Sequence, residues 1–127
     1  AIATAKLAQP DPTAGLADAE HLAKEIPELG LFDDAASRLS VEAKIKMALE
    51  AETAAMEADK RITNSSGAGF SESKGVTVRA NSRGFIGAYE ASSCSLSVSV
   101  IATEDDGMQV GSWWSSSRKL SGLASPQ

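Results

Sequence analysis

Very few side chains in this sequence could perform chemistry, and they do not form a catalytic pattern. His21 is the single histidine and Cys94 is the single cysteine. A protein-built zinc site needs several ligands at short spacing, such as an HExxH pair, and an activated thiol needs a neighbouring base. We therefore predict no catalytic residue and no metal ligand in this chain. His21 is expected to be partly exposed on a short helix, and Cys94 to be a buried structural thiol.

Acidic and glycine-rich stretches suggest ligand loops, but each fits a turn better. The stretch 104–107, three acidic residues followed by glycine, lacks the twelve-residue ligand spacing of a calcium loop. Residues 67–69 and 81–84 resemble neither a dinucleotide fingerprint nor a phosphate-binding loop, because no helix is expected to open after them. We interpret 104–107 as a solvated hairpin turn, since Asp-Gly is a strong reversal signal.

The clearest pattern in the chain is a strict alternation over residues 94–100. Four apolar residues, Cys94, Leu96, Val98 and Val100, alternate with three serines, Ser95, Ser97 and Ser99. A period of two places the apolar set on one face of a strand and the hydroxyls on the other. After the turn, Met108 to Trp114 is expected to return as the partner strand. The hydroxyl row could contact an extended peptide, or it could simply face solvent.

Two adjacent tryptophans follow on that return strand. Because neighbouring strand residues point to opposite faces, one of Trp113 and Trp114 can enter the core while the other stays exposed or at an interface. Ordinary burial is the alternative. The candidate interface or peptide-contact residues are Ser95, Ser97, Ser99, Trp113 and Trp114.

A single helix is expected over Ser40 to Asp59. Ser40 is a favourable N-cap, Glu42 suits the positive end of the helix dipole, and the interior has no Gly or Pro. Six apolar residues fall near one face at helical spacing: Val41, Ile45, Ala48, Leu49, Ala55 and Met56. We expect this stripe to pack on one side of the sheet.

The strands are expected within residues 65–116. Residues 67–73 read as a first strand, Lys74-Gly75 as a turn, and residues 76–80 as a second strand. After a turn at 81–84, residues 85–90 lead into the serine-rich strand. The predicted fold is α+β, an antiparallel meander of about four strands with one helix on one face.

Length and composition bound the function further. A chain of 127 residues, 43% hydrophobic and with a net charge of −5, is expected to form one domain, with a helix tail and loops at 1–39. Acidity disfavours a nucleic-acid surface, and apolar runs fall far short of the roughly 20 residues that span a bilayer. A lone cysteine suits a reducing cytoplasm. The Ala-rich start at residues 1–8 and Ser125-Pro126 read as parts of interrupted helices, so we expect a piece of a longer protein.

Four segments together carry a family resemblance: residues 59–68, 79–85, 92–100 and 105–109. They resemble the PmbA/TldD family, often described as modulator of DNA gyrase, and are more similar to its PmbA (TldE) branch. Asp11-Pro12, residues 15–18 and Leu31-Phe32-Asp33 also fit that branch. The similarity follows the same order over most of the chain.

The resemblance implies a non-catalytic part of the amino-terminal α/β domain of a PmbA-like subunit. Such subunits pair with a TldD-like subunit, or with themselves, in a cytoplasmic zinc metallopeptidase that acts on unfolded peptides. The zinc ligands of TldD lie in an HExxxH motif in its carboxy-terminal domain, and nothing here matches that motif. The alternative from the residues alone is a free-standing module that binds a peptide or protein through the serines and tryptophans.

Overall fold

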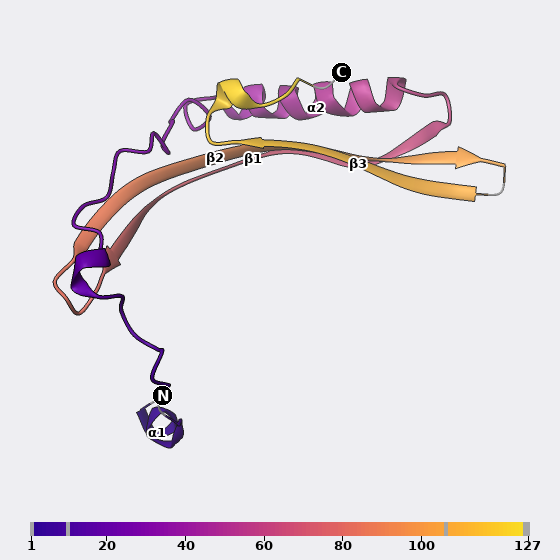
Figure 1. Cartoon of the computed structure of the whole chain (residues 1–127). Coiled ribbons are helices and arrows are strands. Elements are labelled where there is room, and N and C mark those ends of the chain that lie inside the picture. Colours follow the sequence, from indigo (N-terminus) through magenta and orange to yellow (C-terminus); the bar gives the residue numbers. More distant parts are fainter. Residues whose placement is uncertain (1, 10, 106, 126–127) are drawn as a thin grey trace.

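The computed structural model describes residues 2–9, 11–105 and 107–125 of the chain. A short helix α1 (Ile2–Leu7) and a 3₁₀ turn η1 (Ala19–His21) precede the main helix α2 (Val41–Glu57). Three strands follow, β1 (Ile62–Ala80), β2 (Ile86–Glu104) and β3 (Gly107–Ser117), and a 3₁₀ turn η2 (Leu120–Gly122) ends the series. Figure 1 shows a long curved sheet with α2 lying on one side of it. Expectations for Ala1, Asp106 and Pro126 lie outside the described residues.

The described strands form one antiparallel sheet in the order β1-β2-β3, which confirms the α+β class and the meander. Three strands replace the predicted four because Lys74-Gly75 makes no turn. Both residues stay on the ladder, with Lys74 opposite Ser92 and Gly75 opposite Ala91. A hairpin turn needs positive φ at its centre, and pairing along the 19-residue β2 holds this stretch extended instead.

The real reversal between β1 and β2 is built by Asn81. Its Oδ1 accepts hydrogen bonds from the backbone N–H groups of Arg83 at 2.9 Å and Phe85 at 3.2 Å, and Gly84 supplies a φ of +88°. Farther down β1, Gly67 adopts a φ of +121° at the register shift between Ser65 and Gly67. Glycine tolerates that backbone, so the shift is a β-bulge.

Helix α2 forms as the sequence predicts. The hydroxyl of Ser40 accepts the backbone N–H of Ala43 at 3.2 Å, which caps the first turn. Lys46 and Glu50 pair at 3.7 Å on the exposed side, and Lys44 reaches Glu72 of β1 at 2.9 Å. Helix α2 thus contacts β1 and β2, and it covers the apolar face of the sheet.

The side of α2 that meets the sheet contains only part of the predicted stripe: Ala48, Ala55 and Met56 are half-buried, whereas its three branched residues are exposed. Val41, Ile45 and Leu49 are 65%, 53% and 56% exposed, whereas Ala51 is fully buried. Alanine lets the helix approach the pleated sheet closely, so the alanine side packs inward while Val41, Ile45 and Leu49 point away. Cys94, Leu96 and Val98, at 2%, 2% and 6% exposure, supply the sheet side of the core.

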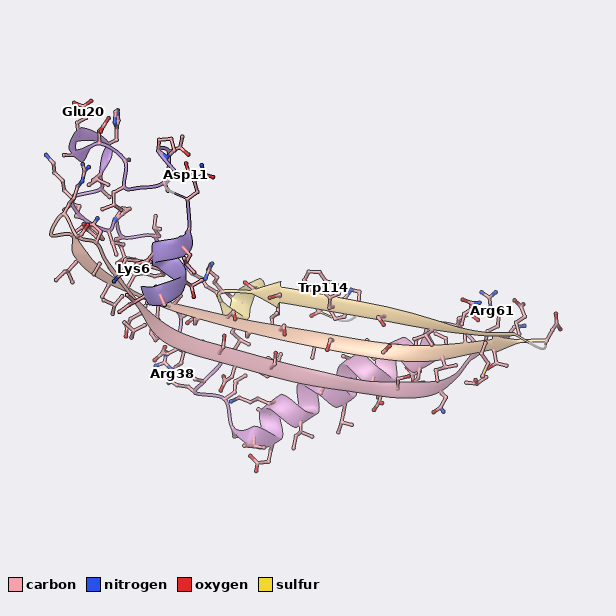
Figure 2. The ribbon with its side chains drawn as sticks, turned by 90° about the horizontal axis from the view of Figure 1, so that it is seen from below. Lys6, Asp11, Glu20, Arg38, Arg61 and Trp114 are labelled. Atoms are coloured by element: carbon pink, nitrogen blue, oxygen red, sulfur yellow. The ribbon has the colours of Figure 1, made fainter. Side chains whose placement is uncertain are left out.

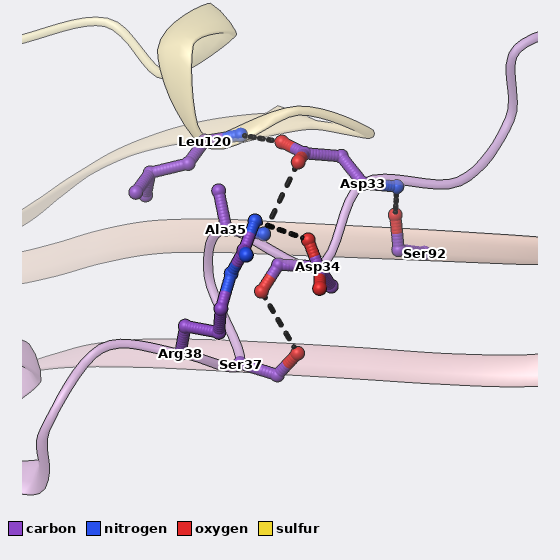
Figure 3. A network of polar contacts seen from close by, with 7 residues as sticks. All are labelled: Asp33, Asp34, Ala35, Ser37, Arg38, Ser92 and Leu120. Atoms are coloured by element: carbon purple, nitrogen blue, oxygen red, sulfur yellow. Dashed lines mark hydrogen bonds and ion pairs between the residues drawn. The ribbon is translucent and has the colours of Figure 1, made fainter.

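A polar network ties the segment before α2 to the end of the chain (Figure 3). The carboxylate of Asp33 accepts the backbone N–H groups of Ala35 and Leu120, both at 3.1 Å. The backbone N–H of Asp33 donates to Ser92 Oγ at 2.8 Å, and that hydroxyl donates to the Arg118 carbonyl at 3.0 Å. One residue therefore joins the N-terminal loop, β2 and η2.

Candidate functional site

The sheet carries a hydroxyl-rich face opposite α2, which we call the serine face. Because β2 alternates, Ser95, Ser97 and Ser99 lie on the side away from the buried Leu96 and Val98. The ladder brings serines of the neighbouring strands beside them. The serine face consists of Ser71, Ser73, Ser93, Ser95, Ser97, Ser99, Ser112, Trp114 and Ser116. Figures 1 and 2 show α2 only on the other side of the sheet.

Hydroxyl pairs run across the serine face between neighbouring strands. Ser71 and Ser95 Oγ atoms lie 2.8 Å apart, and Ser73 and Ser93 Oγ atoms lie 2.9 Å apart. On the same face, between β2 and β3, the Oγ atoms of Ser99 and Ser112 lie 2.8 Å apart. Each hydroxyl has both donor and acceptor capacity, so these pairs can exchange partners with an incoming polypeptide.

Two glycines leave positions on the serine face without side chains. Gly69 lies opposite Ser97 and Gly75 opposite Ala91, and a Cβ at either glycine would meet no atom within 4 Å. A backbone can approach a strand closely where side chains are missing. The serine face therefore offers hydroxyl groups beside positions without side chains. This arrangement suits the main chain of an extended peptide better than a large rigid ligand.

The two tryptophans point to opposite faces, as strand geometry predicts. Trp113 lies opposite Val98 and lines a cavity of ≈ 280 Å³ with Ala51 and other residues of α2. Trp114 lies opposite Ser97 on the serine face and is 71% exposed; it is labelled on β3 in Figure 2. Trp113 retains 37% exposure, so its burial against the helix is partial.

The outer edge of β3 borders the serine face and has no strand partner among the described residues. Met108 and Val110 share this face with Trp114, because they lie opposite Thr103 and Ile101 of β2. They are 71% and 67% exposed. Open backbone hydrogen-bonding groups beside apolar side chains are the features that allow a peptide to add as a further strand.

The alternation in β2 revealed only the central strand of this face. The missed members are Ser93 on β2 itself and, on the flanking strands, Ser71, Ser73, Ser112 and Ser116. Ser71 and Ser73 were missed because the predicted turn at Lys74-Gly75 is wrong. That turn excludes the continuous pairing of β1 with β2 that places these two serines beside β2. Met108 and Val110 alternate with Gly107 and Gln109, and this period of two was the available signal.

The titratable side chains do not gather into a reaction centre in the part of the chain that the structure describes. No group of three His, Cys, Asp or Glu residues there could hold a metal ion. Cys94 is 2% exposed, its Sγ lies 3.6 Å from the Ser117 carbonyl, and burial raises the pKa of the thiol. His21 is exposed in η1. No helix of the described residues is long and apolar enough to cross a bilayer.

Near the acidic turn between β2 and β3, carboxylates form ion pairs with Arg61. Arg61 binds Asp59 at 2.8 Å and Glu104 at 3.4 Å. The Arg61 side chain and backbone N–H lower the pKa of Asp59 to about 2. Glu104 is thereby tied to the start of β1. This arrangement fits the predicted structural turn.

The fold and the sequence comparisons agree on a class of protein. Residues 34–126 match the model of the PmbA/TldA metallopeptidase central domain, and the chain belongs to this family. It is 41% identical over 127 residues to the metalloprotease PmbA of Escherichia coli O157:H7. It is 40% identical over 126 residues to a metalloprotease PmbA homolog of Haemophilus influenzae. Those alignments cover 100% and 99% of this chain and 28% of each relative.

Solved structures show the same fold. A protein of Bacteroides thetaiotaomicron, described as a candidate modulator of DNA gyrase, matches 98% of this chain and 29% of its own with a TM-score of 0.81 and 26% identity. A Thermotoga maritima protein with a similar description covers 82% of this chain and 24% of its own at a TM-score of 0.70 and 23% identity. The resemblance pointed to the family's amino-terminal domain, whereas the matching model describes its central domain.

Proposed function

We propose that this chain is a non-catalytic domain of a PmbA-like subunit in a zinc metallopeptidase that acts on unfolded peptides. The relatives that carry the name metalloprotease support the assignment, and this chain spans about 28% of their length. The described donor set does not fit zinc, because His21 is exposed in η1 while Cys94 is buried on β2. We therefore assign no step of a reaction to these residues.

Within that assembly, the domain would contact the peptide through its serine face. The observation that carries this role is a hydroxyl-covered sheet face on the side away from α2, beside the β3 edge that has no strand partner among the described residues. Main-chain hydrogen bonds give affinity for extended peptides without requiring a particular sequence. The sites proposed for this contact are Ser95, Ser97, Ser99 and Trp114, with Trp113 at the helix side of the same edge. The proposed location is cytoplasmic.

The proposed protein partner is a TldD-like subunit or a second PmbA-like subunit. The gyrase description belongs to the solved relatives, and the net charge of −5 gives no support for contact with DNA. Mixing this chain with a purified TldD-like subunit and an unfolded substrate, such as reduced and alkylated lactalbumin, tests the proposal. In the control sample, which contains this chain, the substrate and zinc but no TldD-like subunit, we expect no cleavage. Zinc-dependent cleavage by the chain alone would contradict the assignment.

A second candidate is a free-standing peptide-binding module. The exposed row of Met108, Val110 and Trp114 favours it, because these side chains could grip a peptide without other domains. Tight binding of unfolded peptide by the isolated chain, with no complex formed with either subunit type, would favour this module. A stable complex with a subunit, and weak binding alone, would favour the peptidase domain.

A further inference from the structure

Helix α2 has two packing surfaces, and only one of them is used by the sheet. Its alanine side packs toward the sheet, with Ala51 fully buried and Ala48 and Ala55 half-buried. On the side away from the sheet, Val41, Ile45 and Leu49 recur at every fourth position and remain more than half exposed. Figure 2 shows side chains of α2 pointing away from the sheet. An apolar row at helical spacing is the usual signature of a packing face.

This outer surface is a shallow groove with an acidic border. Its volume is ≈ 550 Å³, and the lining consists of Glu42, Ile45, Lys46, Leu49, Glu50, Thr53, Ala54 and Glu57. Three glutamates and one lysine leave it negatively charged, and the lysine is already paired with Glu50. We call this surface, together with Val41, the outer α2 groove.

We propose that the outer α2 groove binds an amphipathic helix of a partner polypeptide whose apolar row is flanked by Lys or Arg. Helices dock into apolar grooves through anchors that recur at helical spacing, and the row on α2, at i, i+4 and i+8, gives such anchors an apolar surface to pack against. Flanking cations complement Glu42 and Glu57, whereas Glu50 is paired with Lys46. A second copy of this chain fits poorly, because antiparallel pairing of two α2 helices would bring the acidic borders together. This inference does not depend on the peptidase assignment.

Two synthetic helices test the proposal with the intact chain. The probe peptide carries leucines at i, i+4, i+7 and i+11 flanked by arginines, and the matched peptide has glutamates in place of the arginines. We expect the arginine peptide to bind at least about tenfold more tightly in fluorescence anisotropy, and its affinity to fall as salt increases. Equal binding of both peptides, or no binding of either, would overturn the proposal.

Variants of the chain locate the contact. Leu49→Asp should weaken binding of the arginine peptide about tenfold or more, because it places a charge in the apolar row. Leu29→Asp is the matched control, since Leu29 is 61% exposed in the N-terminal loop, and it should leave binding within about twofold. Glu57→Lys should weaken the arginine peptide and strengthen the glutamate peptide. Self-association that Leu49→Asp abolishes, seen by sedimentation, would overturn the partner helix in favour of a second copy.

Discussion

Asp33 accepts a hydrogen bond from the backbone N–H of Leu120 at 3.1 Å, although 87 positions separate the two residues. This contact closes the loop before α2 onto the end of the sheet (Figure 3). The N–H of Ala35, that of Leu120 and nearby cations lower the pKa of the Asp33 carboxyl below its ordinary value of 3.8. A residue outside the regular elements thus joins the loop before α2 to the segment that follows β3.

We predict that Asp33→Asn lowers the melting temperature by a few degrees at neutral pH. Ala35 and Leu120 donate to different carboxylate oxygens, and asparagine replaces one of these oxygens with an NH2 donor. A depressed folded-state pKa contributes stability above the unfolded value, and this contribution is lost as pH falls below 3.8. The difference in melting temperature between the variant and the native chain should therefore become smaller at acid pH. Thermal melts across pH measure it.

The control for this prediction is Asp18→Asn, which removes the same charge from a residue whose side chain makes no capping hydrogen bond. It should leave the melting temperature nearly unchanged. An Asp33→Asn gap that stays constant through acid pH would show that the carboxylate is not the source of the stability.

Leu96 is the central side chain between the sheet and α2. It is 2% exposed and lies opposite Phe70 on β1 and Ser115 on β3. We predict that Leu96→Ala lowers the free energy of unfolding by about 3 kcal/mol, from lost apolar burial and the cavity left behind. Urea unfolding measures it. Val110→Ala removes apolar atoms from a residue that is 67% exposed and should cost less than about 0.5 kcal/mol; equal losses would contradict the placement of the core.

Cys94 should be chemically inert in the folded chain. It is 2% exposed, and burial raises the pKa of its thiol, so little thiolate is present to react. We predict that alkylation by iodoacetamide is at least about tenfold slower than in denaturing guanidinium chloride, as followed by intact mass. Equal rates in the two conditions would mean that the apolar face of β2 is open in solution.

The sequence predicted the elements that depend on local patterns. Ser40 marked the start of α2 through its capping hydroxyl, and the alternation around Leu96 identified the buried side of β2. Two features escaped because long-range packing decides them. Lys74-Gly75 looks like a turn locally, yet pairing with β2 keeps it extended. Leu49 looks like a core residue, yet the sheet accepts the alanine side of α2 instead.

The candidate site was predicted only in outline for the same reason. Ser97 was identifiable from its own strand, whereas the partners of Ser95 and Ser99 depend on register. That register brings Ser71 to Ser95 and Ser112 to Ser99. The exposure of Trp114 follows from its pairing with Ser97 on the side away from α2, which no local pattern specifies.

The fluorescence of Trp114 tests the central claim, that the serine face contacts unfolded peptide, most directly. In a Trp113→Phe variant, Trp114 is the remaining tryptophan, and it is 71% exposed on that face. The titrant would be tryptophan-free fragments of reduced and alkylated lactalbumin, so that the emission comes from Trp114 alone. Iodide would serve as the quencher. The account predicts a blue shift and at least about twofold less quenching in the complex, as expected when an aromatic ring is covered. Binding that leaves both the spectrum and the quenching of Trp114 unchanged would contradict it.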